Sequence, residues 1–164
     1  EMSTYLLSDP RFQGISDSRR DVIFSWCSKE YKNLMKATRA GVPAPEPHGF
    51  EKNVLVMEFF GDEMRPAPRL KDVNLHEPER ELEFLLEQVK TLWQDEDLVH
   101  GDLSEYNVLW HEKPRLIDFS QGVMRSHPLA DELLERDIEN LLNHFGKRYG
   151  IERDDAAVLD SIRS

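Results

Sequence analysis

Two short apolar segments joined by four turn-forming residues constrain the fold of this chain more than any other feature. The segments are NVLW (residues 107–110) and RLIDF (residues 115–119), and residues 111–114 between them, HEKP, have the composition of a hairpin turn. Antiparallel strands joined by a short turn bring their outer ends together. We therefore expect Asn107, at the start of the hairpin, to lie beside Asp118 at its end.

A polar loop, HGDLSEY (residues 100–106), runs directly into this hairpin and adds Asp102 to the same place. Carboxylate and amide oxygens of this kind suit Mg²⁺, which completes its shell with phosphate and water. An aspartate held slightly apart can take a proton from an attacking hydroxyl or water. The alternative is that Asp102 and Asn107 only cap turns and that Asp118 only ends a strand. The conjunction of all three with His100 favours a site.

The remaining pattern predicts an α+β protein that is mostly helical around this hairpin. An extended segment is expected where VPAPEP (residues 42–47) carries three prolines, a buried strand over residues 52–61, and an irregular stretch or short helix over residues 66–73. Helices are expected over residues 17–41, 77–97, 126–150 and 154–164, with Asp17 or Ser18 as the first N-cap, Pro78 at the start of the second helix, and Gly41 and Gly146 or Gly150 near helix exits.

The first predicted helix carries a carboxylate inside its apolar stripe. Glu30 lies four residues after Trp26 and four before Leu34, and Ile23 and Ala37 extend the same stripe. A carboxylate on an apolar face is costly unless it is paired. Glu30 either reaches water at the edge of the stripe or forms an ion pair with a cation outside the helix. The second helix has a more regular stripe, made by Leu82, Leu85, Leu86, Val89 and Trp93.

Two further features have weaker signals. A strand that stops at Gly61, as in Met57-Glu58-Phe59-Phe60-Gly61, leaves backbone groups that could bind the edge of a planar base, although most such strands simply end in a turn. Asp137, in the helix predicted over residues 126–150, either hydrogen-bonds the backbone of the His100–Asp102 loop or faces solvent.

Charge and residue usage exclude several classes of function. The net charge of -11 argues against general binding of nucleic acid, which needs a basic surface. The single cysteine, Cys27, cannot form an internal disulfide and fits a packed side chain in a reducing cytosol. No apolar run is long enough to span a membrane. The histidines lack the spacing of a zinc site, and we expect His100 to hydrogen-bond within its loop.

These motifs together resemble those of a known family. His100-Gly101-Asp102 with Asn107 is similar to the protein-kinase catalytic loop H-R-D-x-x-x-x-N, and IDFS (residues 117–120) is similar to the D-F-G element. More narrowly, HGDLSEYNVL, IDFSQ, MEFFGDEMRPAPRL, KEYKNL and HPLADELLERDIENLL resemble the type-one branch of the RIO family of atypical serine/threonine kinases. The similarity covers the chain from Tyr5 to about Tyr149.

The resemblance implies a protein-kinase-like fold, with a partial N-lobe over residues 1–60 and a C-lobe over residues 61–164. It implies that ATP and Mg²⁺, with Mn²⁺ as an alternative ion, are the cofactors. It also implies a cytoplasmic protein whose partner is the precursor of the small ribosomal subunit or its assembly factors, with no membrane and no sequence-specific DNA binding. The implied roles are catalysis for Asp102 and Asp118, metal binding for Asn107 and Asp118, phosphate acceptance for Asp118, and nucleotide binding for Met57, Glu58, Phe60, Glu30 and Ser104.

The chain also departs from the kinase pattern. Gly101 replaces an arginine, Ser104 stands where many kinases have lysine, and no A-P-E motif follows Asp118. No glycine-rich loop or V-A-x-K strand precedes Glu30, so Glu1 is interpreted as a cut end and the isolated chain is expected to turn ATP over poorly. Two alternatives stay open, namely a small-molecule phosphotransferase of the aminoglycoside- or choline-kinase-like type and a non-catalytic binding module.

Overall fold

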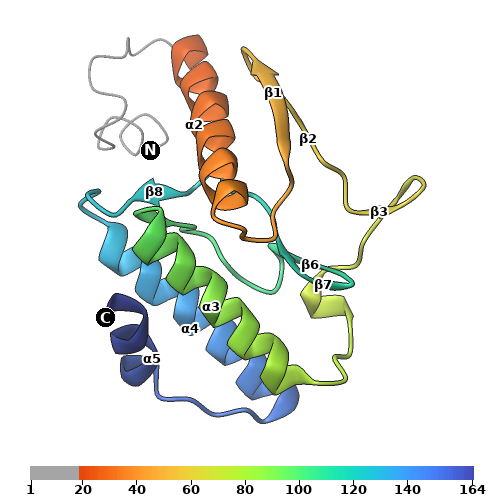
Figure 1. The fold of residues 1–164 in the computed structure, drawn as a ribbon, viewed down its shortest axis with the longest axis vertical. Helices are drawn as coiled ribbons and strands as arrows, with labels where there is room; N and C mark the ends of the chain where they lie inside the picture. Colours follow the sequence, from red (N-terminus) through yellow and green to blue (C-terminus); the bar gives the residue numbers. More distant parts are fainter. Residues whose placement is uncertain (1–18) are drawn as a thin grey trace.

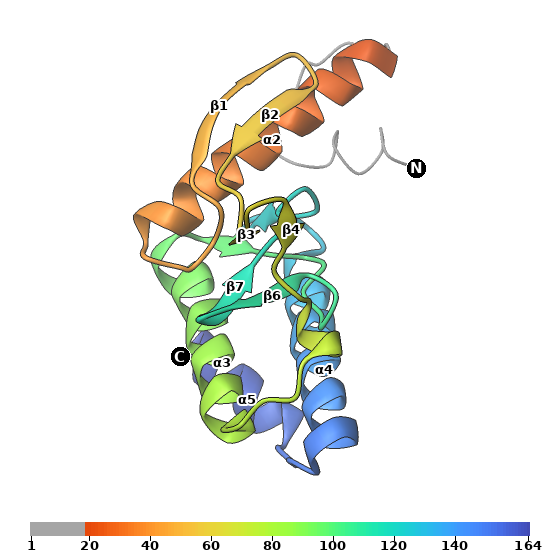
Figure 2. The same ribbon diagram turned by 90° about the vertical axis from the view of Figure 1, so that its right-hand side faces the viewer.

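One long helix and a β-hairpin lie above a layer of three helices, and short strands and loops fill the space between the two layers (Figure 1). The computed structural model describes residues 19–164. The upper part consists of α2 (Arg19–Arg39), β1 (Pro47–Glu51) and β2 (Val54–Met57), and the hairpin runs along one side of the helix (Figure 2). The predicted N-caps Asp17 and Ser18 lie outside the described residues.

Helix α2 ends where the sequence predicts, because Gly41 adopts a φ of 81° and its N–H donates to the carbonyl of Thr38 at 3.1 Å. Of the predicted apolar stripe, Leu34 and Ala37 are buried, whereas Ile23 is 41% exposed. Ile23 lines an open cavity of about 300 Å³ with Trp26 and Leu55. Cys27, also on α2, is a buried free thiol.

The strand expected over residues 52–61 forms only at β2, and the expectation that it is buried was wrong. Strand β2 pairs with β1 in antiparallel register, with Phe50 opposite Leu55. Val54 is 59% exposed and Val56 is 54% exposed. Alternate residues of a strand point to opposite faces. This sheet has two strands and α2 on one face, so the face that carries Val54 and Val56 is open among the described residues.

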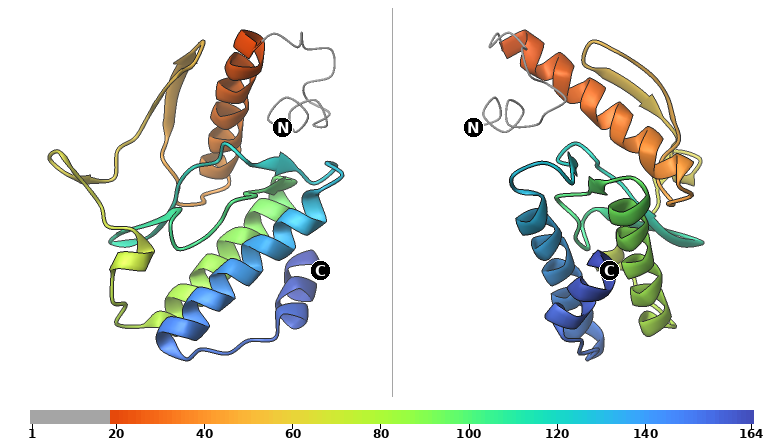
Figure 3. Two further views of the ribbon diagram at one scale, coloured as in Figure 1. Left: turned by 180° about the vertical axis from the view of Figure 1, so that it is seen from behind. Right: turned by 60° about the vertical axis from the view of Figure 1, so that its left-hand side comes forward.

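The lower layer contains the core. Helices α3 (Pro78–Asp95) and α4 (Ala130–Tyr149) lie side by side, and the short α5 (Asp155–Arg163) packs against both (Figure 3). Pro78 occupies the first turn of α3, and Gly150 ends α4 in a left-handed conformation, as predicted. The predicted stripe of α3 is confirmed by the burial of Leu82, Leu85, Val89 and Trp93, with Leu86 partly buried. None of the described helices combines the length and the apolarity needed to cross a membrane.

Short strands connect the two layers. Between β2 and α3 the chain forms β3 (Gly61–Asp62), β4 (Arg65–Pro66) and a single 3₁₀ turn, η2 (Leu70–Asp72), which confirms the short helix expected there. The predicted hairpin is present as β6 (Val108–His111) and β7 (Lys113–Leu116). It turns more tightly than expected, at Glu112 with a φ of 63°, and its second strand ends at Leu116 rather than Phe119. Strands β5 (Leu98–Val99) and β8 (Val123–Met124) form another antiparallel pair.

Candidate active site

Two polar loops meet between these strand pairs. The first loop, residues 100–107, connects β5 to β6, and the second, residues 117–122, connects β7 to β8. Because β5 pairs with β8 and β6 pairs with β7, both loops are held at both ends. The N–H of Ile117 donates to the carbonyl of Asn107 at 3.0 Å, which extends the hairpin up to the site. The hairpin therefore brings the two loops together as the sequence predicts.

Asp102 and Asn107 are in direct contact across the first loop. The side-chain amide nitrogen of Asn107 donates to the carbonyl oxygen of Asp102 at 2.7 Å and to its carboxylate Oδ2 at 3.1 Å. This pairing leaves the amide oxygen of Asn107 available for another ligand. The Asp102 side chain is exposed, so an incoming hydroxyl or water can reach its carboxylate.

Asp118 stands at the start of the second loop in a left-handed conformation, with a φ of 61°. Asp is one of the few residues besides glycine that tolerate this region. Its Oδ1 accepts a hydrogen bond from the hydroxyl of Ser120 at 2.5 Å and a longer one from the Ser120 N–H at 3.4 Å. These contacts hold the conformation. They do not involve Oδ2, and the carboxylate is exposed.

Gly101 explains how the two loops can approach so closely. It has a φ of 81°, and a Cβ at this position would lie 2.9 Å from the carbonyl oxygen of Gln121 in the second loop. A side chain there would strain the backbone and press against that carbonyl. The replacement of the kinase arginine by glycine therefore has a local structural reason in this chain.

Helix α4 fixes the backbone of the first loop through Asp137. The carboxylate of this residue, 1% exposed, accepts the N–H of Gly101 and the N–H of Leu103, both at 2.8 Å. Burial raises the pKa of Asp137 to about 7, against the opposing effects of the two backbone donors and of Arg136. The hydrogen-bonding role predicted for Asp137 is confirmed, and the solvent-facing alternative is wrong.

Two neighbours of Asp137 on α4 also hold this loop, and the sequence analysis missed both. Arg136 donates from Nη2 to the carbonyl of Gly101 at 2.6 Å, and Asn140 donates from Nδ2 to the carbonyl of Leu103 at 3.1 Å. Their spacing from Asp137, one residue before and three after, is the only sequence signal that could have marked them. Together the three side chains satisfy four backbone groups of a loop that has no strand partner.

His100 forms hydrogen bonds within the site, as predicted. Its Nδ1 accepts the N–H of Asp102 at 3.3 Å, so Nε2 carries the proton and lies 2.9 Å from the carbonyl of Ile117 in the second loop. Burial lowers the pKa of His100, which keeps the ring neutral. The ring packs against the fully buried Phe119, with the ring centroids 4.7 Å apart. His100 therefore couples the two loops.

Glu30 lies on α2, near the second loop, and forms no ion pair with a cation of the described residues. Burial raises the pKa of Glu30 first, and the negative charge of Asp118 raises it further. No cation of residues 19–164 forms an ion pair with it, so the predicted ion pair is not found in the described part of the chain. The effect of Asp118 on Glu30 means that the two carboxylates are near each other, so a cation bound at Asp118 would also stabilise the ionised form of Glu30.

The segment predicted to bind a base ends β2 and continues past it. The N–H of Glu58 donates to the carbonyl of Glu46 at 2.8 Å, and the carbonyl of Phe60 accepts the N–H of Ala67 at 2.9 Å. Neither the carbonyl of Glu58 nor the N–H of Phe60 takes part in these bonds, and the binding of a planar base there stays a prediction. Met57 is 38% exposed, whereas the Phe60 ring is buried with the guanidinium carbon of Arg115 4.9 Å from its centroid.

Ser104, the other residue predicted to bind the nucleotide, shapes the first loop locally. Its hydroxyl accepts the N–H of Tyr106 at 3.3 Å, and its carbonyl accepts the N–H of Asn107 at 3.0 Å. These bonds make a compact turn that delivers Asn107 to Asp102. A direct contact of Ser104 with a nucleotide stays a prediction.

The donor set fits a magnesium ion better than a metal that needs many protein ligands. Within residues 19–164 no three carboxylate, imidazole or thiolate groups converge. The amide oxygen of Asn107 and the carboxylate of Asp118 would supply two oxygen ligands, which fits Mg²⁺ because this ion takes one or two ligands from a protein when phosphate and water supply the rest.

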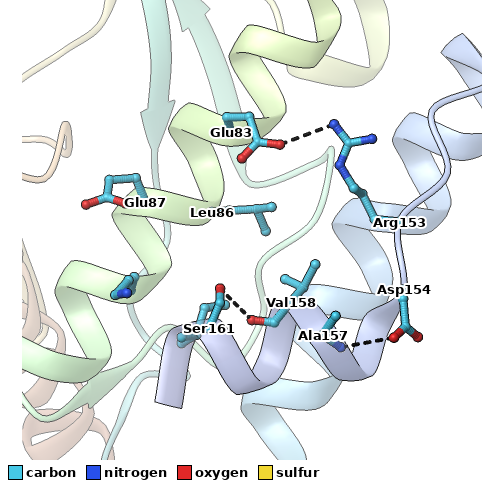
Figure 4. Close-up of a pocket in the computed structure, with 10 residues that line it drawn as sticks. Glu83, Leu86, Glu87, Arg153, Asp154, Ala157, Val158 and Ser161 are labelled. Atoms are coloured by element: carbon cyan, nitrogen blue, oxygen red, sulfur yellow. Dashed lines mark hydrogen bonds and ion pairs between the residues drawn. The ribbon is translucent and has the colours of Figure 1, made fainter. Parts of the chain in front are cut away.

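A separate groove lies between α3 and α5. It has a volume of about 340 Å³, with Leu86, Ala157 and Val158 in its lining and the Glu83–Arg153 ion pair, at 3.2 Å, on its border (Figure 4). Asp154 accepts the N–H of Ala157 there and caps α5. These groups already bond to one another, and the groove holds none of the residues of the two loops.

Comparison with solved structures defines the class of protein. The chain resembles the Rio2 kinase from Chaetomium thermophilum, in an ADP/Mg²⁺-phosphoaspartate complex, with a TM-score of 0.68 and 23% sequence identity over 83% of this chain and 44% of that chain. At this identity the likeness is evidence for the fold alone. The fold is α+β and protein-kinase-like, as predicted.

The family follows from the sequence comparisons. The family model of the RIO domain matches residues 1–158. The chain is 43% identical over 159 residues to the RIO-type serine/threonine-protein kinase Rio1 of Thermoplasma acidophilum, covering 97% of this chain and 83% of that protein. It is 44% identical over 148 residues to Rio1 of Methanocaldococcus jannaschii, covering 90% of this chain and 51% of that protein, so it spans about half the length of that relative. The chain belongs to the RIO family, and both of these relatives are RIO-type serine/threonine-protein kinases.

Proposed function

We propose that the protein containing this chain is an ATP-dependent serine/threonine kinase or ATPase of the RIO type. The observation that carries the proposal is the contact between Asn107 and Asp102, made beside Asp118 at the end of a shared hairpin. This arrangement supports a site in which one carboxylate accepts a proton and two oxygen ligands hold a metal within a single pair of loops. Family membership supports the same activity.

The chemistry assigned to each group follows from its position. Asp102 is exposed and would accept the proton of the attacking hydroxyl or water as the oxygen–phosphorus bond forms and ADP departs. Asn107 and Asp118 would hold Mg²⁺, or Mn²⁺ in its place, and the ion would neutralise charge on the phosphates. Glu58 and Phe60 would bind adenine through their backbone groups, next to Met57.

Asp118 is also proposed to accept phosphate itself. A related Rio2 kinase has been captured as an ADP/Mg²⁺-phosphoaspartate complex. In this chain, a carboxylate oxygen of Asp118 would attack the γ-phosphorus, the bond to the bridging oxygen would break, and ADP would leave with that oxygen. Water would then hydrolyse the acyl phosphate and regenerate the carboxylate, with Asp102 accepting the proton.

The connection between the hinge, which is the segment of residues 57–61 predicted to bind a base, and α3 is short. This favours the proposal over a small-molecule phosphotransferase. Between Gly61 and Pro78 the chain forms only β3, β4 and η2. It therefore lacks, in this interval, the helical substrate region that such enzymes carry. A non-catalytic module would have no need for the complete set of Asp102, Asn107 and Asp118.

Replacing Asp118 by Asn in the full-length protein tests the proposal. We expect Mg²⁺-dependent ATP turnover to be lost, together with any protein-bound phosphate that hydroxylamine releases, because acyl phosphates react with it. Asp95→Asn is the matched control, since Asp95 is an exposed aspartate at the end of α3. Unchanged turnover in Asp118→Asn would refute the role assigned to Asp118.

We further propose a cytoplasmic protein that acts on precursors of the small ribosomal subunit, a role that rests on the resemblance to the RIO family. Co-sedimentation of the full-length protein with these particles, in the presence of ATP and of ADP, tests it. Sedimentation that is free of the particles under both conditions would contradict the proposal.

A further inference from the structure

A buried asparagine ties helix α2 to the loop that carries Asp118. Asn33 is 0% exposed, and its Nδ2 donates to the carbonyl of Phe119 at 2.9 Å and to the carbonyl of Gly122 at 3.1 Å. Both acceptors belong to the second loop. Both N–H donors of a buried side-chain amide need hydrogen-bond acceptors, because an unpaired polar group in the interior is costly.

The two carbonyls are the two ends of one turn. The N–H of Gly122 donates to the carbonyl of Phe119 at 3.1 Å, so residues 119–122 close on themselves and Asn33 bridges the closure. A Cβ on Gly122 would lie 2.7 Å from Nδ2 of Asn33. Glycine is therefore required here so that the turn can approach the amide closely.

The same turn contacts the first loop on another side, where Gln121 lies against Gly101. The turn is thus wedged between α2 and the loop of Asp102. Asn33 also lies three residues after Glu30, on neighbouring positions of one helix face. A shift of α2 would move Glu30 and the second loop together.

We propose that Asn33 is a positioning residue that fixes the turn after Asp118 to α2 and thereby sets where the Asp118 carboxylate meets the metal. This inference rests on the proposed function for the role of Asp118. Without the two hydrogen bonds of Asn33, residues 119–122 become more mobile. The Asp118 oxygens then occupy the position that the ion requires less often. The affinity for Mg²⁺ falls, while the proton-accepting role of Asp102 is untouched.

Asn33→Leu tests the proposal, because leucine has a similar size and no donors. Measured in the full-length protein at saturating ATP, the Mg²⁺ concentration for half-maximal turnover should rise about tenfold. Hydrogen exchange without metal or nucleotide should become faster in residues 117–123 and remain unchanged in α3. Asn143→Leu, at an exposed position on α4, is the matched control and should alter neither quantity.

Two further variants keep the test decisive if Asn33→Leu does not fold. Gly122→Ala presses on the amide from the opposite side and should raise the same Mg²⁺ requirement. Asn33→Asp retains at most one donor, when protonated, and should give an intermediate rise. A purely structural role for Asn33 would instead lower thermal stability and turnover with no change in the Mg²⁺ requirement, and that result would overturn the proposal.

The exchange measurement separates this inference from the proposed function. If the wild-type protein shows no Mg²⁺-dependent turnover, the proposed function is refuted, and with it the metal-positioning role. If turnover depends on Mg²⁺ but residues 117–123 keep their protection from hydrogen exchange in Asn33→Leu, the hydrogen bonds of Asn33 do not hold the turn. In that case the inference alone fails.

Discussion

Gly101 is subject to two constraints: its φ is positive, and it lies close to the second loop. Gly101→Ala combines the strain of a φ of 81° with a Cβ 2.9 Å from the Gln121 carbonyl. We expect it to lower the free energy of unfolding by about 1–3 kcal/mol. Urea unfolding measures this, with Gly49→Ala as the control, because nothing lies within 4 Å of a Cβ there. Equal stability of the two variants would contradict the constraint.

Asp137 gives the active-site loop a pH dependence whose sign can be stated. Its pKa is raised from 3.8 to about 7 in the folded protein, so between these values the folded state binds its proton more tightly than the unfolded state. The contribution of Asp137 to stability is therefore greatest at acidic pH and falls as pH rises towards 7.

Comparison with Asp137→Asn isolates this contribution, since asparagine does not titrate. The free energy of unfolding of the wild type, minus that of the variant, should decrease by more than about 1 kcal/mol between pH 5 and pH 8. Denaturant unfolding at four pH values measures the difference. A constant difference would mean that Asp137 is ionised throughout and that its two backbone donors outweigh burial.

Individual residues were predictable from sequence where a short-range pattern places them. Asp102, Asn107 and Asp118 follow from one loop and one hairpin, both local in the chain. Asn33, Arg136 and Asn140 were missed because each donates to a backbone carbonyl at least 35 residues away. A carbonyl leaves no mark in the sequence, and long-range partners of this kind need the fold.

At the scale of elements, α3 is the most firmly specified part of the structure. Leu85 is 0% exposed in the core between α3 and its neighbours. Leu85→Ala should lower the free energy of unfolding by about 2–5 kcal/mol, because it leaves a cavity that neighbouring side chains fill only in part. Chemical unfolding tests this, with Glu87→Ala, exposed on the same helix, expected to stay within about 0.5 kcal/mol of wild type. A loss below about 1 kcal/mol in Leu85→Ala would contradict the packing.

The contrast between α3 and β2 explains which elements a sequence specifies. Helix α3 has an apolar stripe of helical period, a proline in its first turn and a buried face that matches the stripe. Strand β2 is a short apolar run whose composition is the same whether one face or both are covered. The run therefore predicted a strand correctly but not its exposure, because exposure depends on what packs against each face of the sheet.

At the scale of the whole molecule, the two loops that carry the site lie between the two layers (Figure 1), and α2 also reaches the lower layer through the ion pair of Arg39 with Glu96 at 2.7 Å. A ligand held by both loops should therefore stabilise the whole fold. ADP with Mg²⁺ at 100 times its dissociation constant should add about 2.7 kcal/mol. For a chain of this size that corresponds to a rise in Tm of roughly 5–10 °C.

Thermal unfolding with ADP and Mg²⁺, and with ADP and a chelator, measures this linkage. The rise should be much smaller with the chelator, because without the ion Glu30 and Asp118 repel each other and the phosphates find no cation at the loops. Asp118→Asn should respond to ADP alike under both conditions, since it lacks the carboxylate that holds the ion. A full rise in Tm with the chelator would instead mean that ADP binds without the metal, through Glu58 and Phe60 of the hinge alone. Nucleotide binding would then not depend on the two loops.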